Sequence, residues 1–224
     1  MLLIGLIILI FSFLVYASYS IGSGVYVKAY CRGKVTRRSI AITFDDGIDP
    51  IQTPRVLDVL HKYNVKATFF IIGVKGNQYP DLLKRIVLEG HLIGNHSYSH
   101  KGWFPFLSKD SIMRELQKTE HVLNSIGSHT QLFRPPFGVT NPTIGAAVRS
   151  LNYKVIGWSI RSFDTCNRPM YKTVARIKNR LNPGAILLLH DNRPQSDVLL
   201  EAVLLMLKEL KYDVERVDTL LNMQ

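Results

Sequence analysis

The sequence predicts an α/β domain in which parallel strands are joined by helices. Apolar runs typical of buried strands alternate with amphipathic helical patterns from residue 39 onward, which indicates parallel strands with helical crossovers. No stretch rich in Pro, Gly or Ser and no internal repeat interrupts the alternation, so a single domain is expected. The chain has 224 residues, of which 46% are hydrophobic and 20% charged, a composition that excludes disordered and collagen-like proteins.

The predicted strands are short apolar runs bounded by polar residues, and the predicted helices repeat apolar side chains every three or four positions. The strands cover 39–44, 67–72, 91–95, 132–134, 154–158, 185–189 and 213–214. The helices cover 53–63, 81–88, 108–126, 141–151, 170–181 and 198–210. Gly127 ends the third helix, and Asn141 followed by Pro142 begins the fourth as an N-cap and a first helical residue.

The first 17 residues contain no charged side chain and are mostly Leu, Ile, Phe and Val. An apolar run of about 18 residues is near the minimum for a membrane-spanning helix. A cleaved secretory signal is the alternative, with Val15-Tyr16-Ala17 as its cleavage site, but no basic segment precedes the run. We therefore expect a transmembrane anchor and linker in 1–27, a catalytic domain in 28–224, and a single-pass membrane location.

The charge balance is basic, with 28 Lys and Arg against 17 Asp and Glu and a net charge of +11. Such an excess favours contact with polyanions. The sequence has no phosphate-binding glycine loop, zinc-finger spacing or RNA-binding motif, so no nucleic-acid partner is expected. Two cysteines, Cys31 and Cys166, are too few for a disulfide scaffold, and whether they pair is left open.

Side chains that can carry chemistry follow the predicted strands. Because the carboxyl ends of parallel strands meet at one face of a sheet or barrel, we expect these side chains to converge there. They are Asp45, Asp46, His96, Arg134, Asp164 and His190.

Two histidines, His96 and His100, stand four residues apart and can share one metal ion. A strand-end carboxylate would complete a His₂Asp set with a position open for water, which is the ligand count of catalytic sites. The neighbouring carboxylate of the Asp45-Asp46 pair would be free to act as a general base. Two surface histidines and a plain Asp-Asp-Gly turn are the alternative interpretation.

Arg134 precedes two prolines, where it either pairs with a carboxylate and keeps that group ionised or lies on the surface. His190 follows an apolar strand, and a single histidine there is most often a packed core or rim residue. Each of these residues is ordinary alone, whereas their joint occurrence at strand ends points to a site.

Four ordered motifs resemble those of the polysaccharide deacetylase family, also called the NodB-homology or carbohydrate esterase family 4 domain, over residues 39–224. The motifs are Thr43-Phe44-Asp45-Asp46-Gly47, His96-Ser97-Tyr98-Ser99-His100, Arg134-Pro135-Pro136-Phe137-Gly138 and Leu187-Leu188-Leu189-His190-Asp191. The resemblance implies a distorted (β/α) barrel of about seven parallel strands with a divalent metal, usually zinc. An Asp-His-His set also accepts Co²⁺, Ni²⁺, Fe²⁺ or Mn²⁺.

The resemblance also implies a role for each site residue. Asp45 resembles the general base, Arg134 the residue that orients this base, and His190 the general acid. Asp164 fits the acidic position that would hold His190 and raise its pKa. The residues that resemble the metal ligands are Asp46, His96 and His100.

Substrate contacts are expected at the walls of the pocket. Leu188 resembles part of the pocket for the acetyl methyl group, and the other expected contacts are Pro136, Phe137 and Trp158. Two residues depart from the family pattern: Thr165 stands where a pocket tryptophan is expected, and Ile48 where proline is common. Both departures touch substrate fit rather than the metal ligands.

The resemblance implies a metal-dependent hydrolase that removes acetyl groups from N-acetylglucosamine-type residues of a glycan, with bacterial cell-wall peptidoglycan as the expected polymer. The same site acting on chitin-like oligosaccharides, O-acetyl esters or a small cyclic amide is an alternative, as is a non-catalytic glycan-binding module. We expect a monomer whose domain faces the cell envelope. The Lys and Arg residues at 28–38 favour the opposite orientation by the positive-inside rule.

Overall fold

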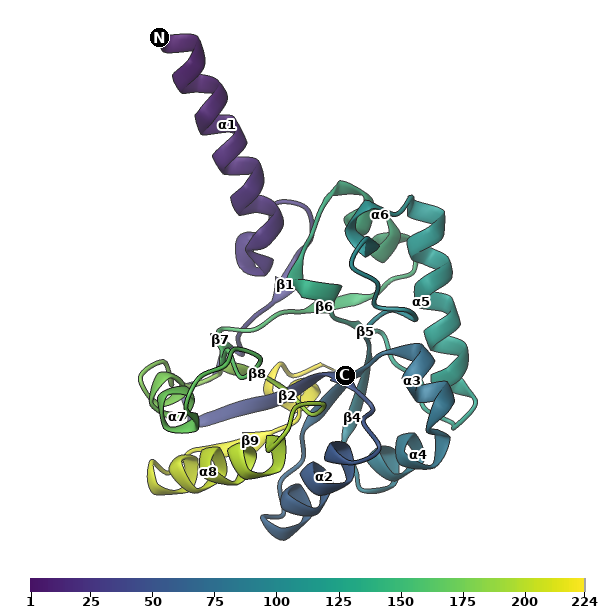
Figure 1. Ribbon diagram of the computed structural model, residues 1–224, viewed down its shortest axis with the longest axis vertical. Coiled ribbons are helices and arrows are strands. Elements are labelled where there is room, and N and C mark those ends of the chain that lie inside the picture. The colour runs from purple at the N-terminus through teal and green to yellow at the C-terminus, as the bar shows by residue number, and fades with distance from the viewer. Residues whose placement is uncertain (224) are drawn as a thin grey trace.

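The computed structural model describes residues 1–223 and consists of a curled parallel sheet with helices packed around its outside (Figure 1). The strands are β1 Ala29–Tyr30, β2 Ser39–Gly47, β3 Thr68–Ile71, β4 Leu92–Asn95, β5 Leu132–Phe133, β6 Lys154–Ile156, β7 Ile160–Arg161, β8 Ile186–His190 and β9 Asp213–Glu215. The helices are α1 Leu2–Tyr19, α2 Gln52–Lys62, α3 Gly73–Gln78, α4 Pro80–Leu88, α5 Lys109–Asn124, α6 Pro142–Ser150, α7 Met170–Lys178, α8 Ser196–Glu209 and α9 Val217–Leu220. Three 3₁₀ turns complete the set: η1 Ile21–Ser23, η2 Phe104–Phe106 and η3 Pro136–Gly138.

The strand order is β1-β6-β5-β4-β3-β2-β8-β7, and β9 pairs with the beginning of β2. Every pairing between these strands is parallel. Within residues 1–223 the edge strands β1 and β7 do not pair with each other, so the sheet curls without closing. The predicted parallel α/β fold and its barrel-like curvature are confirmed, although the sheet has nine strands rather than about seven.

Strand β2 is a continuous apolar run because it lies in the core. Both faces of this strand are buried, as in other parallel sheets covered by helices. On the outer face, Phe44 stacks on Phe69 with ring centroids 4.9 Å apart, beneath α2 and α8. On the inner face, Ala41 packs with Phe70 and Ile186. These two apolar layers fix the position of the residues at the carboxyl end of β2.

The N-terminal segment differs from the prediction. It forms α1 over 18 residues, about 27 Å at 1.5 Å per residue, which is shorter than the ~30 Å hydrocarbon core of a bilayer. The domain holds the last turn of this helix, because the backbone N–H of Thr140 donates to the Ser18 carbonyl (2.9 Å) and the Thr140 hydroxyl to the Ala17 carbonyl (3.2 Å). Among residues 1–223, no helix has the length and apolarity needed to span a membrane. The prediction of a single-pass membrane location is therefore wrong, and no described helix supports the predicted transmembrane anchor or membrane partner.

Two helices near the site begin with side-chain caps, of which only the one at Asn141 was predicted from the sequence. The Ser108 hydroxyl accepts from the Ser111 N–H at 3.3 Å, and the Asn141 side chain accepts from the Ile144 N–H at 2.7 Å. The Asn141 amide also donates to the carbonyl of Pro105 at 2.6 Å, which ties α6 to η2. Both cysteines are free thiols.

Candidate active site

Strand β2 carries two adjacent carboxylates to the end of the sheet. Asp45 is buried and lies opposite His190 in the register between β2 and β8. Asp46 has a left-handed backbone with φ of 66°, which breaks the pleat of the strand at this point. Both carboxylates consequently line one cavity instead of pointing to opposite faces of the sheet.

A fully buried arginine fixes one of these carboxylates. Arg134 donates from one guanidinium nitrogen to Oδ1 of Asp45 at 2.7 Å, and from the other two to the carbonyls of Ile156 (3.0 Å) and Gly157 (2.8 Å). Burial lowers the pKa of Arg134, and the charge of Asp45 opposes that shift. Because Arg134 contacts only Oδ1, the second oxygen of Asp45 is available, 3.8 Å from Nε2 of His96.

The second carboxylate lies beside two histidines. One ligand atom each from Asp46, His96 and His100 forms a group whose members lie within 4.8 Å of one another. Oδ1 of Asp46 is 3.4 Å from Nε2 of His96 and 3.3 Å from Nε2 of His100. The structure thus brings together the three residues predicted as metal ligands.

The hydrogen bonding of His96 tests whether this group suits a metal. Nδ1 of His96 lies 2.7 Å from the backbone carbonyl of Arg134, which can only accept, so Nδ1 carries the proton. The other ring nitrogen, Nε2, faces the carboxylate of Asp46 and is the atom that can bind a metal. Electron-pair donors that face one another suit a cation between them, and a carboxylate with two imidazoles is a donor set for divalent transition metals. These residues can therefore hold a divalent metal.

The protonation states favour the same conclusion. Burial by itself raises the pKa of Asp46, but the hydrogen bond to His96 and the charges of His96, His100 and His190 lower it overall. Burial lowers the pKa of His100 to about 4. At neutral pH Asp46 is therefore ionised and His100 neutral, which are the forms that bind metal.

Hydrogen bonds from neighbouring elements hold the loop that carries both histidines. The side-chain oxygen of Asn95 accepts from the N–H of Ser97 at 2.9 Å, while its amide donates to the hydroxyl of Tyr153 at 3.0 Å. Glu115 on α5 accepts from both the N–H (2.7 Å) and the hydroxyl (2.9 Å) of Ser99. These contacts allow the loop to keep left-handed backbones at Ser97 and His100.

On the opposite side of the cavity, a carboxylate holds a third histidine. Oδ1 of Asp164 lies 2.9 Å from Nδ1 of His190, and Oδ2 accepts the backbone N–H of His190 at 2.7 Å. The hydroxyl of Ser162 also donates to Oδ1 of Asp164 at 2.8 Å. Burial lowers the pKa of His190, but the bond to Asp164 and nearby carboxylates outweigh burial and raise it. Nε2 of His190 is left facing Asp46, 4.0 Å from its Oδ2.

These groups surround a cavity of about 180 Å³. Three of the four predicted substrate contacts line it, namely Phe137, Trp158 and Leu188, whereas Pro136 is buried and does not line it. Phe137 is half exposed at the rim, and its ring centroid lies 4.8 Å from that of His100.

The two departures from the family pattern have different structural settings. Thr165 lines the cavity, so the replacement of the expected tryptophan leaves a smaller side chain in its wall. Ile48 is buried among core residues of the cluster that contains Phe44, and it does not line the cavity.

Sequence reasoning missed three residues near the site. The hydroxyl of Thr43 donates to the Leu187 carbonyl and accepts from Arg134, each at 2.8 Å. Asp191 is buried and accepts from the Thr53 hydroxyl at 2.6 Å. Thr43 and Asp191 lie inside recognised motifs, which was the available signal. Arg161 lines the cavity from β7, but that strand is too short to give a pattern.

Comparison with known proteins agrees with this arrangement. The family profile described as "Polysaccharide deacetylase" matches residues 32–156. A peptidoglycan-N-acetylglucosamine deacetylase of Bacillus cereus is 34% identical over 159 residues, 70% of this chain and 58% of the relative. The chain spans about half the length of the first curated relatives that it matches, 58% and 42% for two of them.

Two solved structures have the same fold. The peptidoglycan-N-acetylmuramic acid deacetylase PdaA of Bacillus subtilis is 34% identical over 86% of this chain and 75% of the relative. Its structure superposes with a TM-score of 0.79 and 30% identity, covering 90% of this chain and 87% of that one. A pseudoenzyme of carbohydrate esterase family 4 from Bacillus anthracis gives a TM-score of 0.80 at 28% identity, over 86% of this chain and 68% of that one. With the family profile matched over more than half of its length, this chain belongs to the polysaccharide deacetylase family.

Proposed function

We propose that this chain is a metal-dependent hydrolase that removes acetyl groups from N-acetylglucosamine-type residues of a glycan, with cell-wall peptidoglycan as its polymer. The observation that carries this proposal is that two side chains, each held by a charged partner, face one cavity from opposite sides. Asp45 is fixed by Arg134 on one side, and His190 is fixed by Asp164 on the other. Hydrolysis of an amide needs a base and an acid at two such positions.

The base is the carboxylate of Asp45. Its Oδ1 is bonded to Arg134, so Oδ2 accepts the proton of a water molecule as that water attacks the acetyl carbonyl carbon. The buried Arg134 cation holds the carboxylate of Asp45 in place through a 2.7 Å ion pair. Leu188 supplies the apolar wall against which the acetyl methyl group lies.

The acid is the imidazolium of His190. Asp164 holds Nδ1, so Nε2 donates its proton to the sugar nitrogen as the carbon–nitrogen bond breaks. The raised pKa of His190 favours the protonated ring, which is the form that can donate this proton. Acetic acid leaves and the sugar amine remains on the glycan. Asp45 then returns its proton to solvent and His190 takes one up, which restores both groups.

Asp46, His96 and His100 would hold the metal, and zinc is the ion that we propose for this donor set. A divalent metal there supplies Lewis-acid stabilisation of negative charge on the acetyl oxygen, a contribution of several kcal/mol.

The first prediction concerns acetate release from N-acetylated glycans. We expect the protein to release acetate from peptidoglycan fragments, to lose this activity to a chelator, and to regain it with added Zn²⁺. Asp46→Asn should abolish metal binding and lower kcat by a factor of at least 10², since a metal ligand is removed. Asp45→Asn should abolish turnover while the metal content, measured by atomic emission, stays near one equivalent.

Asp110→Asn serves as the control, because it makes the same charge change at an exposed residue in the first turn of α5. Chitin oligomers and acetylated xylan, assayed in parallel, identify the polymer and separate amide from ester hydrolysis. Full activity in Asp45→Asn would contradict the proposed base.

A non-catalytic glycan-binding role is the second candidate, because one solved relative of the same fold is a pseudoenzyme. Thr165 in the cavity wall is the observation that favours it. Tight metal binding with no acetate from any of the three glycans would favour this role over the hydrolase.

A further inference from the structure

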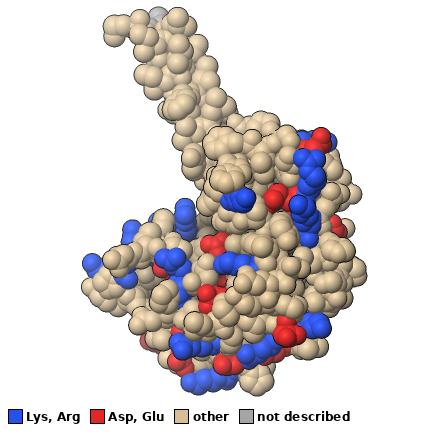
Figure 2. Space-filling model, turned by 45° about the vertical axis from the view of Figure 1, so that its right-hand side comes forward, with Lys and Arg blue, Asp and Glu red and all other residues tan. Residues whose placement is uncertain are grey.

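The segment after Trp158 concentrates positive charge beside the cavity. Residues 161–180 contain six Lys and Arg and one acidic residue, Asp164, which is bonded to His190. Figure 2 shows the lobe that carries α7 at the left, where most of the charged atoms belong to Lys or Arg. This local excess is a large part of the net charge of +11.

Three arginines of this segment surround one aromatic ring. The guanidinium carbons of Arg161, Arg168 and Arg176 lie 5.0, 5.2 and 4.4 Å from the ring centroid of Phe163. Among the ion pairs within residues 1–223, none includes any of the three. Burial and the charges of Arg180 and Arg168 lower the pKa of Arg176, as expected where positive charge is uncompensated.

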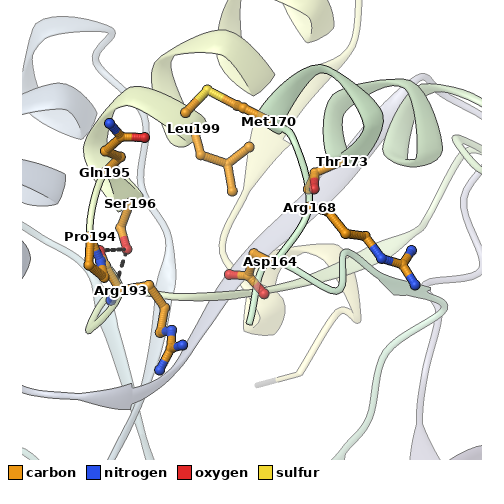
Figure 3. A pocket seen from close by; sticks show the side chains of 9 residues that line it. All are labelled: Asp164, Arg168, Met170, Thr173, Arg193, Pro194, Gln195, Ser196 and Leu199. Atoms are coloured by element: carbon orange, nitrogen blue, oxygen red, sulfur yellow. Dashed lines mark hydrogen bonds between the residues drawn. The ribbon is translucent and has the colours of Figure 1, made fainter. Parts of the chain in front are cut away.

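A second pocket, of about 110 Å³, lies beside these arginines, and its wall includes Arg168 and Asp164. Figure 3 shows Arg168 and Arg193 on either side of Asp164, with both guanidinium groups directed away from the apolar end formed by Met170 and Leu199. Within the described chain, neither guanidinium donates a hydrogen bond to a protein acceptor. Both oxygens of Asp164 are bonded to His190, so this carboxylate does not occupy the arginines.

The two pockets are adjacent because one segment forms a wall of each. Arg161 and Thr165 line the catalytic cavity, whereas Asp164 and Arg168 line the second pocket. The planar fork of arginine matches the two oxygens of a carboxylate.

We propose that a glycan bound in the catalytic cavity extends to the second pocket, where Arg168 and Arg193 bind carboxylates of the glycan beside the sugar that is deacetylated. The preferred substrate is then an N-acetylated glycan that carries carboxylates, rather than a neutral polymer. This inference rests on the proposed deacetylase function, and it adds the group that the enzyme recognises next to the acetamide.

The test compares a peptidoglycan fragment with the same fragment after its carboxylates are converted to neutral amides. For wild-type protein we expect kcat/KM for acetate release to be roughly ten-fold higher with the carboxylated fragment. Arg168→Gln and Arg193→Gln should each lower this preference by about three- to five-fold, and the double variant should remove it. The preference should also decrease as salt is raised.

Lys208→Gln, in the last turn of α8, removes the same charge elsewhere and should keep the full preference. Equal kcat/KM for the two fragments, or a preference that survives in the double variant, would overturn the carboxylate site while leaving the deacetylase function intact. If wild-type protein releases no acetate from either fragment, the hydrolase proposal fails instead. Calorimetric binding of the two fragments then decides the arginine site: tighter binding of the carboxylated fragment that is lost in the double variant supports it, and equal binding refutes it.

Discussion

Arg134 is a buried cation whose charge is balanced by one carboxylate. Each nitrogen of its guanidinium donates to a protein acceptor, and its backbone carbonyl accepts from His96. One residue therefore positions both the proposed base and a proposed metal ligand. The ring of Phe70 lies 4.2 Å from the guanidinium carbon and supplies a further cation–π contact. A buried pair of this kind is costly to break because the remaining charge is left without a partner.

Arg134→Met should therefore lower the free energy of unfolding by about 3 to 5 kcal/mol and abolish acetate release, because Asp45 becomes an unpaired buried charge. Urea unfolding of the wild type, Arg134→Met, Asp45→Asn and the double variant gives the coupling between the two residues. We expect the double variant to be more stable than the sum of the single losses, since it has no unpaired charge. Strict additivity would show that the pair is not coupled.

Asp191 is a buried carboxylate outside the proposed chemistry. Burial raises its pKa from 3.8 to about 6, although the Thr53 hydroxyl opposes the shift. A group whose pKa is raised by folding stabilises the protein below its unfolded pKa, and this contribution is lost as the pH rises through the folded value. The affected window thus runs from about pH 4 to about pH 6.

Asp191→Asn removes this titration. As the pH rises from about 4 to 7, the free energy of unfolding of the variant should increase by about 3 kcal/mol relative to that of the wild type. Urea unfolding at each pH measures this difference. Asp81→Asn, at an exposed position in the first turn of α4, controls for the general effect of a lost charge. A difference between wild type and Asp191→Asn that does not change with pH would contradict the assignment.

The turn that follows Arg134 packs against the wall of the cavity, and the next helix is bonded to η2. Gly138 has φ of +70°, and a Cβ there would lie 2.3 Å from the ring of Trp158, so only glycine lets this turn pack against the cavity wall. Three residues later, Asn141 caps helix α6, and its amide donates to the carbonyl of Pro105 in η2. Helix α6 and η2 are therefore held to each other through one side chain.

Asn141→Ala should cost about 2 kcal/mol of unfolding free energy, because it removes the N-cap and the bond to η2 together. Ser108→Ala, which removes the N-cap of α5 and a bond to the Ser111 hydroxyl in the same turn, should cost about 1 kcal/mol. Thermal and urea unfolding of both variants provide the comparison. Equal losses would show that the bond to Pro105 contributes little.

The elements that sequence analysis identified are those with a strong pattern. β2, β3 and β8 are apolar on both faces, and α5 repeats its buried residues with helical spacing, so each was predicted near its observed position. β1 and β7 have two residues each, and α3 contains two glycines in six residues, so none of them shows a period. Short elements of this kind are defined by their neighbours rather than by their own residues.

For the molecule as a whole, the alternation of strands and helices was sufficient to predict convergence of the site, because parallel strands share one carboxyl edge. The sequence could not predict contacts made by the backbone, such as the hydrogen bond between the Arg134 carbonyl and His96. It also could not predict the hydrogen bond from Arg134 to the Thr43 hydroxyl. It also could not show that the N-terminal helix is bonded to the domain, since composition reports apolarity but not contact.

The end of that helix and the residues that follow it have a practical consequence for where the folded unit begins. Ala17, Ile21 and Val27 are buried, and Ile21 and Val27 pack with Phe104 and Ile144 in the cluster beneath α6. Recombinant protein starting at Ala17 keeps this cluster, whereas protein starting at Lys28 loses two apolar side chains worth about 1.5 to 3 kcal/mol each. The shorter protein should therefore have a lower urea midpoint, with a loss comparable to a large part of the stability of an ordinary domain. Ile21 and Val27, which follow the apolar run, thus contribute to the core, and an equal midpoint for the two proteins would contradict this.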